Sequence, residues 1–377
     1  MSRKASVSMA AVFPREAGPP RAAPRSRPRS SWSGPHFNLE ICMKKSVIAL
    51  AVLGTVAGVA SAQSSVTLYG RVDAAYSKNI GNKVRGINDT QQSRIGFKGV
   101  EDLGGGLKAV FNLESGLNTD TGAQAGSTST GQFWNRRAVV GLETGFGRVL
   151  LGREYTPAYT LVEAVASPWG TDTVAGNAGG LRKIITGGAD TRAPFGNGTT
   201  NQEVDTIRAD NSVNYYFSTS GFSVGAQWAA KETTSNATKN PFGLAASYAA
   251  GPVYVALGYT NPADRDDHWT TLHASYDFGI VKLGGFFGTG RQADDDKTRS
   301  WLLSATAPIG GGELRVAYGQ LKDKVGGTGT VRSEAKVTAL GYHYFLSKRT
   351  RIYVDVANDS KNAISKTGYD FGVRHDF

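Results

Sequence analysis

Seven short turns and eight longer polar connections divide most of this chain into sixteen segments of strand length. The short turns are clusters of Gly, Pro and Ser of the kind that close hairpins, at 103–107, 144–147, 218–221, 250–252, 277–279, 308–312 and 346–349. The longer connections lie near 77–92, 118–131, 154–207, 231–240, 261–268, 290–298, 322–333 and 358–366. This punctuation predicts sixteen strands in an antiparallel meander, with both chain ends on the short-turn side.

Within these segments, apolar and polar residues alternate with a period of two. From Val66 to Tyr76 the even positions are apolar or small, whereas the odd positions include Arg71 and Asp73. After residue 62 no run approaches 18 consecutive apolar residues, so we expect no membrane helix. Backbone in the hydrocarbon layer is satisfied only by helices or closed barrels. The predicted fold class is therefore all-β: a 16-stranded antiparallel transmembrane β-barrel with short turns at one rim and long loops at the other.

The connection at 154–207 is the longest in the chain. Structureless connections beyond about 12–15 residues are uncommon in compact domains and are usually functional or disordered. This one has a mixed composition, with an apolar piece at 159–165 and the run Pro168-Trp169-Gly170. We expect it to fold into the lumen of the barrel and narrow the bore; a disordered surface loop is the alternative.

A secretion signal is predicted at 43–62. Met43-Lys44-Lys45 precedes an apolar run that ends in Ala60-Ser61-Ala62, the pattern of a charged region, an apolar region and a cleavage site. The Arg- and Pro-rich segment 1–42 is then expected to be a non-native or removed extension, and 63–377 the barrel. Residues 1–62 carry nine basic and two acidic residues, so +7 of the formal +11 charge and the single Cys42 leave with them. The remaining +4 argues against a nucleic-acid partner, and the mature chain can have no thiolate catalysis or disulfide.

No enzymatic or metal-binding motif stands out. We find no Gly-x-Ser-x-Gly, Walker loop or His-Glu-x-x-His, and we expect no cofactor. The four histidines beyond residue 62 lack metal-ligand spacing and are predicted to lie at the rim or in the lumen: His268, His273, His343 and His375. The run Asp294-Asp295-Asp296-Lys297 is interpreted as an exposed loop tip, with a divalent-cation or lipopolysaccharide-bridging role as the alternative.

Several short runs together carry a family resemblance. They are Leu68-Tyr-Gly-Arg71, Arg94-Ile-Gly-Phe-Lys-Gly99 with Glu101-Asp-Leu-Gly104, Asn135-Arg-Arg-Ala-Val-Val-Gly-Leu142, Phe146-Gly147, Leu151-Gly-Arg153 and the terminal Phe377. In this order and spacing, residues 63–377 resemble the general trimeric porins of the Gram-negative outer membrane, most closely the β-proteobacterial type. The resemblance implies a homotrimer of water-filled barrels in the outer membrane that pass ions and small hydrophilic solutes by diffusion. It also implies contacts with outer-membrane lipid and lipopolysaccharide, and with the barrel-assembly machinery through the C-terminal strand.

In this family the third extracellular loop folds inward and places acids opposite a ladder of wall arginines. Carried over, the wall cations are Arg71, Arg94, Arg136 and Arg153. Strand parity supports a lumenal orientation for Arg71 and Arg94; of Arg136 and Arg137 one is expected to point away from the bore, and we choose Arg136 as the wall cation. For the loop acids we choose Glu163 first, Asp172 second and Glu154 third, because Pro194-Phe-Gly-Asn197 lacks the Glu found in some relatives. The aromatic residues Tyr369, Phe371 and Phe377 share one face of the last strand and are the expected assembly signal.

Four wall arginines against two loop acids predict a diffusion pore with a mild anion preference. A substrate-selective outer-membrane channel is the alternative, and it would show saturable conductance with one solute. An outer-membrane enzyme is the third class. It would need a Ser/His/acid set on one exterior strand face, and we cannot assemble such a set from this sequence.

Overall fold

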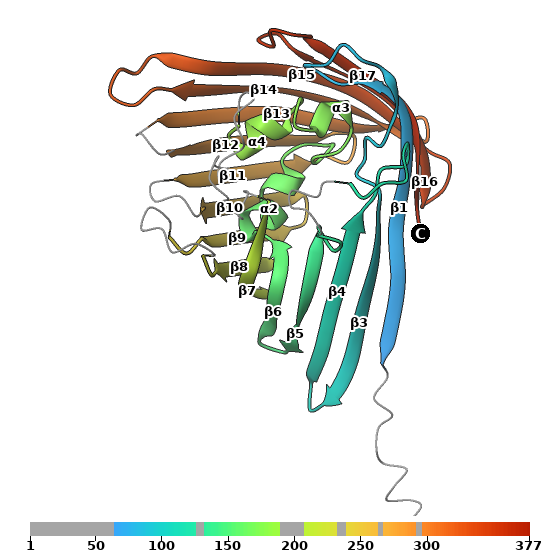
Figure 1. Cartoon of the computed structure of the whole chain (residues 1–377), viewed down its shortest axis with the longest axis vertical. Helices are drawn as coiled ribbons and strands as arrows, with labels where there is room; N and C mark the ends of the chain where they lie inside the picture. The colour runs from blue at the N-terminus through green and yellow to red at the C-terminus, as the bar shows by residue number, and fades with distance from the viewer. Residues whose placement is uncertain (1–63, 126–131, 189–206, 232–238, 263–266, 292–295) are drawn as a thin grey trace, which may run out of the picture. The chain divides into compact units, whose positions relative to one another are not determined.

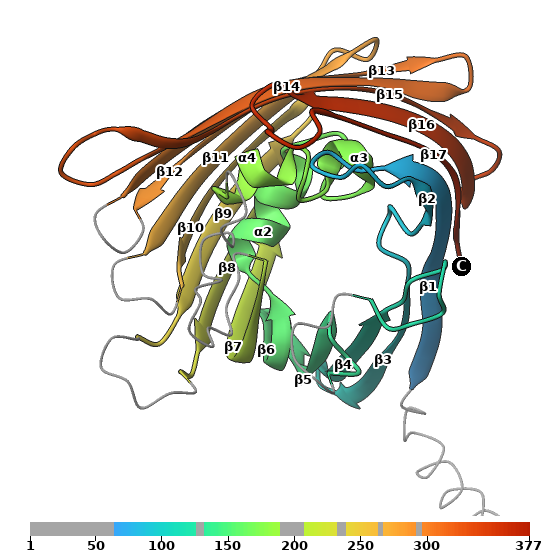
Figure 2. The same cartoon turned by 45° about the horizontal axis from the view of Figure 1, so that its top comes forward.

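A single antiparallel sheet closes on itself into a barrel (Figures 1 and 2). This computed structural model describes residues 64–125, 132–188, 207–231, 239–262, 267–291 and 296–377. The predicted signal and extension, and Pro194 to Asn197 of the long connection, lie outside these ranges. Residues Ala60–Phe377 form one compact unit. The first strand, β1 (Ser65–Lys78), pairs with β3 (Arg94–Gly104) on one side and with the last strand, β17 (Thr367–Asp376), on the other, which closes the barrel.

Sixteen long strands make the wall, as the sequence predicted, and the short β2 (Gly86–Asn88) pairs only with β1. The remaining strands are β4 (Leu107–Gly116), β5 (Arg137–Thr144), β6 (Gly147–Tyr155), β7 (Arg208–Thr219), β8 (Phe222–Ala229), β9 (Phe242–Ala250), β10 (Val253–Asn261), β11 (His268–Asp277), β12 (Lys282–Arg291), β13 (Lys297–Ile309), β14 (Gly312–Lys324), β15 (Val331–Phe345) and β16 (Thr350–Asp359). Short turns follow every second strand at one rim, and longer connections join the strands at the other. Within the described ranges, no helix has the length and apolar character needed to cross a membrane.

The period-two pattern separates an outward face from an inward one. On β1 the side chains of Val66, Leu68 and Val72 are 68%, 52% and 45% exposed, whereas Asp73 on the other face is fully buried. A lipid-facing wall needs this apolar exterior, because the bilayer replaces water there. The inward face carries the polar and charged residues of the alternation, so it can line an aqueous interior.

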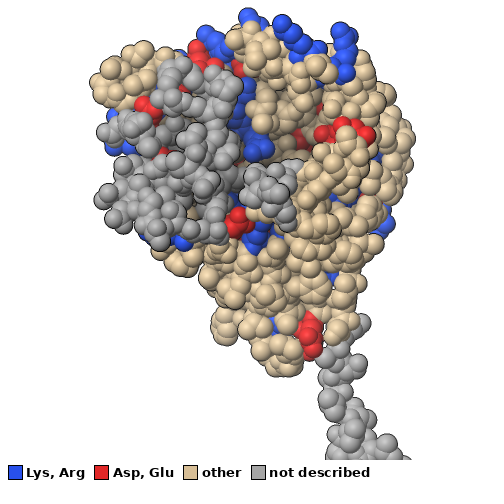
Figure 3. Space-filling view, in the orientation of Figure 1, with Lys and Arg blue, Asp and Glu red and all other residues tan. Residues whose placement is uncertain are grey.

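The described part of the long connection after β6 contains four short helical turns. They are α2 (Pro157–Leu161), η1 (Glu163–Val165), α3 (Thr173–Gly176) and α4 (Arg182–Thr186). Helix α2 begins where Pro157, which lacks an N–H, takes the first helical position and the Thr156 side chain accepts a hydrogen bond from the Tyr159 N–H at 3.3 Å. These helices lie within the ring of strands (Figure 2). In the space-filling view the surface is hollowed near its centre, and Lys and Arg side chains are visible in the hollow (Figure 3).

The helices of this connection pack on one side of the barrel wall. Helix α2 contacts β8, β9 and β10, α4 contacts β12, β13 and β14, and α3 contacts β15, β16 and β17. Glycines on the inward face make room for this approach: a Cβ at Gly258 would lie 2.8 Å from the Ala158 Cβ, and one at Gly319 would lie 3.1 Å from a methyl of Ile184. Wall positions without a side chain therefore let the connection lie close to the sheet.

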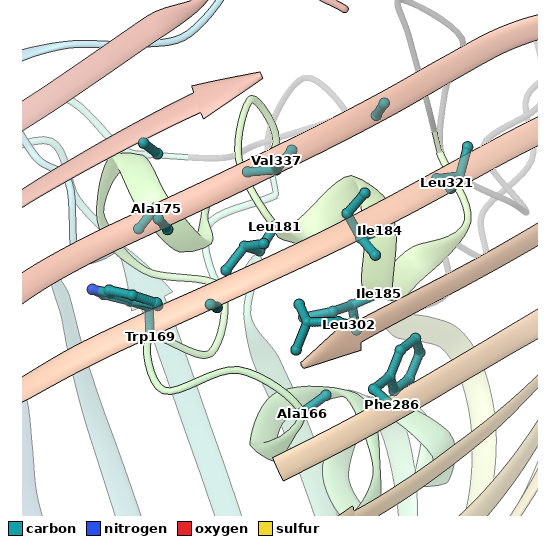
Figure 4. Close-up of a cluster of buried hydrophobic side chains, with 14 of the residues drawn as sticks. Ala166, Trp169, Ala175, Leu181, Ile184, Ile185, Phe286, Leu302, Leu321 and Val337 are labelled. Atoms are coloured by element: carbon teal, nitrogen blue, oxygen red, sulfur yellow. The ribbon is translucent and has the colours of Figure 1, made fainter. Parts of the chain in front are cut away.

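A hydrophobic cluster joins the connection to the wall (Figure 4). From the connection, Leu181, Ile184 and Ile185 are completely buried, and they pack against Leu302 and Leu321 of β13 and β14. Burying a Leu or Ile side chain contributes about 1.5–3 kcal/mol. The cluster also contains Ile80, Val162, Ala166, Trp169, Ala175, Ala256, Phe286, Ala317, Ala335, Val337, Ala339 and Ala357. These inner-wall positions of β10 and β12 to β16 are therefore covered by protein rather than by water.

Candidate pore constriction

Among the described residues, six arginines follow one another along the inner side of neighbouring strands; Arg137, which pairs with Glu154, is not counted with them. In the strand register Arg71 of β1 pairs directly with Arg94 of β3, and Arg351 of β16 pairs directly with Arg374 of β17. Arg71 faces Asp376, two residues from Arg374 along β17. The six, in order around the wall, are Arg136 just before β5, Arg94, Arg71, Arg374, Arg351 and Arg315 of β14. Because β1 pairs with β17, strands β14 to β17 continue around the wall into β1, β3, β4 and β5. Residues far apart in the sequence therefore form one basic stripe.

Arg71 joins the wall to the long connection. Its guanidinium donates to the Asp172 carboxylate at 2.8 Å, to the Asp376 carboxylate at 3.0 Å and to the Gln91 carbonyl at 3.0 Å. Asp172 lies immediately before α3, and Arg374 approaches the same carboxylate at 3.8 Å. The structure thus places Asp172 beside two cations of the stripe.

Arg136 and Arg94 share a carboxylate on β4. The Arg136 Nε donates to Glu114 Oε1 at 2.6 Å, and Arg94 lies 4.0 Å from the same oxygen. Arg136 also donates to the side chains of Gln92 and Tyr155, both at 2.9 Å. All the acceptors belong to the inner side of the barrel.

The expectation that one of Arg136 and Arg137 points away from the bore is wrong. Arg137 shares a strand face with Val139, which is 4% exposed, and donates to the buried carboxylate of Glu154. Arg136 precedes the first residue of β5, so strand alternation does not apply to it. Both side chains therefore point inward. Glu154 pairs with Arg137 rather than with its sequence neighbour Arg153.

Arg153, the fourth predicted wall cation, does not join the stripe. It lies on the face of β6 that carries Val149 and Leu151, which are 42% and 51% exposed on the outside. Its guanidinium donates to the Asn135 carbonyl at 2.7 Å and to the Asp210 carboxylate at 2.6 Å. A register shift between Gly152 and Glu154 interrupts the pairing with β7 at this point. A residue-by-residue comparison of motifs cannot show such a shift.

Of the two predicted loop acids, Asp172 lies at the stripe and Glu163 does not. The Glu163 side chain is completely buried in η1, so it presents no carboxylate to water. The choice of Glu163 as the first loop acid of the constriction is therefore wrong. The Asp172 side chain keeps 21% exposure while it pairs with Arg71.

A pocket of about 270 Å³ lies between the stripe and the long connection. Arg315, Arg351 and Arg374 line its wall side together with His343 and Gln91, and residues 167–170, 172 and 173 line the other side. Arg315 donates to the Pro168 carbonyl at 2.9 Å and to the Glu313 carboxylate at 2.6 Å. Among the described residues, Arg351 has no carboxylate within 4.0 Å, and its guanidinium lies over the Phe345 ring at 5.7 Å. These three arginines were not among the wall cations predicted from the sequence.

Buried polar contacts hold the connection against the wall beside this pocket. The Trp169 indole donates to Asp355 Oδ1 at 2.6 Å, and His343 Nε2 lies 3.1 Å from Asp355 Oδ2. Lys183 of α4 donates to Asp359 at 2.8 Å, with both side chains nearly buried. Buried charges persist only when they are paired and hydrogen-bonded. The partners on β15 and β16 therefore specify where the connection lies.

The other predicted residues have simpler surroundings. Asp296 is 2% exposed and accepts a hydrogen bond from the Gly326 N–H at 2.9 Å, so the exposed-tip interpretation is wrong for this residue; Asp294 and Asp295 lie outside the described residues. His273 and His343 are buried on the inward face, whereas His375 lies near the short-turn rim and contacts Thr350. In the described part of the chain, no group of His, Cys, Asp or Glu side chains could hold a metal ion.

The C-terminal residue completes the closing strand pair. The Phe377 N–H and carbonyl bond to the carbonyl and N–H of Gly70 at 3.1 and 3.0 Å. Its ring covers Gly70, where a Cβ would lie 2.4 Å from the ring edge. Phe371 is 63% exposed on the outward face of β17, and Tyr369 lies on the same face.

A family model described as Gram-negative porin matches the sequence over residues 49–363. The chain belongs to this family. Outer membrane porin protein 32 of Delftia acidovorans is 35% identical to this porin over 379 residues, covering 89% of the chain and 100% of the relative. An outer membrane porin protein of Bordetella pertussis (strain Tohama I) is 30% identical over 415 residues, with coverage of 89% and 100%.

Among solved structures, an anion-selective porin from Comamonas acidovorans superposes with a TM-score of 0.66 at 29% identity, covering 84% of this chain and 100% of that one. The predicted outer-membrane location and the class of passive diffusion channel follow from these matches. The porin family and these relatives are channels rather than enzymes.

Proposed function

We propose that this porin is an anion-preferring channel for ions and small hydrophilic solutes, with its constriction formed by the arginine stripe and Asp172. The observation that carries the proposal is the charge balance of the stripe. In the described residues, its six arginines have four carboxylates within 4.0 Å, namely Asp172, Asp376, Glu114 and Glu313. Six cations less four anions leave a net charge of +2, which favours anions mildly.

The mechanism is electrostatic. Hydrophobic packing of the connection against the wall takes up part of the interior, and solutes pass through the remaining part, beside the arginines. Arginine is always charged and is less strongly hydrated than an ammonium, so it can exchange water for a passing anion at little cost. Asp172 supplies a negative pole next to Arg71, and the resulting field orients polar solutes. An apolar solute gains nothing from this field and must displace ordered water.

The proposal is tested by measuring the reversal potential of a single-residue variant of the porin in a salt gradient. Arg351→Gln removes the stripe cation that has no carboxylate within 4.0 Å in the described residues, so its charge is the least neutralised. We expect the reversal potential to move towards the cation value. The matched control is Arg349→Gln, which removes one exposed Arg charge in the turn between β15 and β16 and should leave the reversal potential unchanged. An equal shift in both variants would refute a role for the stripe.

A substrate-selective channel is the second candidate, and the pocket of about 270 Å³ is the observation that favours it. Three arginines around one pocket suit a small carboxylate or phosphate. Conductance that saturates with one organic anion and not with chloride would support selectivity. Linear conductance for both would support general diffusion.

The assembly proposals from the sequence are a homotrimer, contacts with lipid and lipopolysaccharide, and recognition of the C-terminal strand by the assembly machinery. The porin family supports the first, and the outward aromatic side chains of Tyr369 and Phe371 support the last. The mass of the detergent-solubilised protein, corrected for bound detergent, tests the trimer. A mass of one chain would reject it.

A further inference from the structure

The loop after β2 (89–93) is held against the inner wall by a buried carboxylate. Asp73 of β1, which is fully buried, accepts hydrogen bonds from the N–H groups of Thr90 and Gln91 at 2.9 and 3.0 Å. The Tyr353 hydroxyl donates to the same carboxylate at 2.6 Å. Because a buried charge is stable only when it is hydrogen-bonded in this way, the loop has a defined position on the wall.

From this loop the Gln92 amide reaches the long connection. Its Nε2 donates to Asp172 Oδ1 at 3.1 Å, and to the carbonyl and hydroxyl oxygens of Thr171 at 3.0 and 2.9 Å. Its Oε1 accepts a hydrogen bond from the Arg136 guanidinium at 2.9 Å. These charges fix the orientation of the amide, since only its NH₂ group can donate to a carboxylate and only its oxygen can accept from a guanidinium. Gln92 therefore joins a cation of the stripe to the loop acid through a neutral group.

The Gln92 amide completes a hydrogen-bonded chain along the constriction. In order, the members of this chain are Glu114, Arg136, Gln92, Asp172, Arg71 and Asp376. At each link a donor faces an acceptor, and Gln92 is the one neutral side chain among these six. Inverting the polarity of one member should therefore break the chain even where the shape of the side chain is kept.

The backbone is strained where the loop meets the connection. Gln92 has a φ of 56° and Thr173 a φ of 60°, in the left-handed region that long or β-branched side chains rarely adopt. The Thr173 N–H donates to the Thr90 carbonyl at 2.6 Å, so both strained residues belong to this contact. Asn adopts such a backbone more readily than Gln, but its side chain is one methylene shorter. The presence of the longer side chain at position 92 indicates that its reach is needed.

We propose that Gln92 is a positioning residue of the constriction, whose amide holds the Asp172 carboxylate on Arg71 and keeps this part of the long connection against the wall. The place of the negative pole is thus set by the loop after β2 as well as by the long connection. This inference rests on the proposed function, because it takes Asp172 as the acid of the constriction.

A double-mutant cycle between side chains of equal shape tests the inference in the purified porin. Gln92→Glu sets two carboxylates against each other. Asp172→Asn sets two amide NH₂ groups against each other while its oxygen stays on Arg71. The double variant Q92E/D172N has the net charge of the unmodified porin and restores the order of donors and acceptors. Its carboxylate at position 92 accepts from Arg136 and from the amide at position 172.

The matched control is Gln320→Glu. The Gln320 amide also donates to a carboxylate, that of Glu334 at 2.7 Å, but it lies on the outward face of β14. The control therefore makes the same chemical change beside an acid, away from the constriction. A further variant, Gln92→Asn, suits the left-handed backbone but is too short to reach both partners.

The two readouts are hydrogen exchange of peptides from 170–177 and the current noise of the open channel. Each single variant of the cycle should raise the exchange at least about tenfold, because a hydrogen bond to a charged group is lost. The double variant should exchange more slowly than either single variant, and its noise should fall back towards that of the unmodified porin. Gln92→Asn should raise the exchange, and Gln320→Glu should change neither readout.

Three results would overturn the proposal. They are unchanged exchange in the single variants, a double variant that exchanges at least as fast as the faster single variant, and slower exchange in Gln92→Asn. The last result would mean that the backbone alone positions the connection. A failure of the proposed function is distinguishable, because it would appear as a cation-selective reversal potential of the unmodified porin and would leave the outcome of the cycle unaltered.

Discussion

Replacing Trp169 by Phe should loosen the long connection without loosening the barrel. The Trp169 indole donates to Asp355 at 2.6 Å inside the barrel, and both groups are buried. Phe keeps most of the ring packing and removes only the donor. A hydrogen bond to a charged group contributes about 1.5–3 kcal/mol. At about 1.4 kcal/mol per factor of ten, the population of the detached connection should rise about 10-fold to 150-fold.

Hydrogen exchange measured by mass spectrometry reads out this population. Peptides from 157–187 should exchange faster by that factor, because local opening limits the exchange of their amides. Peptides from β13 and β14 should not change. The control is Trp301→Phe, since Trp301 is 37% exposed on the outward face and lies away from the connection. Unchanged exchange in the connection, or an equal increase in the wall strands, would refute the argument that Trp169 anchors it.

Three further predictions follow from the stripe, the loop after β2 and the closing strand. Arg94→Gln with Arg136→Gln should move the reversal potential in a salt gradient towards cations, and no movement would remove both residues from the constriction. Burial raises the pKa of Asp89 to about 6, against hydrogen bonds from backbone N–H groups that lower it. The folded state therefore binds the proton more tightly than the unfolded state, and stability falls as the pH rises from about 4 to about 6. Asp89→Asn should flatten this slope in thermal unfolding, and an unchanged slope would contradict the assignment. Deleting Phe377 removes both backbone hydrogen bonds to Gly70, so refolding followed by heat-modifiable gel mobility should slow, and an unaltered rate would argue against a closing role.

The wall could be predicted from the sequence because its signal repeats. Strand alternation, turn clusters and long connections occur in the same order along residues 63–377, so one ambiguous strand is corrected by its neighbours. The same parity places Arg71 and Arg94 on the inner face. It could also have found Arg351 and Arg374, each of which alternates with apolar outward residues such as Ile352 and Val373.

Other residues of the constriction could not be placed in this way. Arg136 precedes the first residue of β5, so counting does not orient it; the choice of Arg153 follows from the family resemblance alone, although Arg153 shares the parity of the outward Val149 and Leu151. Glu163 and Asp172 belong to short helical turns without a repeating pattern, and their burial depends on contacts with strands more than 100 residues away. The charge pairing of the constriction is therefore a property of the closed sheet rather than of any local motif.

The central claim is that a net positive stripe beside the long connection makes this porin an anion-preferring channel. Its most direct test is the reversal potential of the unmodified porin in planar bilayers under a potassium chloride gradient. The preference should be for chloride, strongest near 0.1 M salt, where charges act over about 10 Å, and weaker near 1 M, where they act over about 3 Å. A reversal potential of the cation-selective sign, or one independent of salt concentration, would contradict the account.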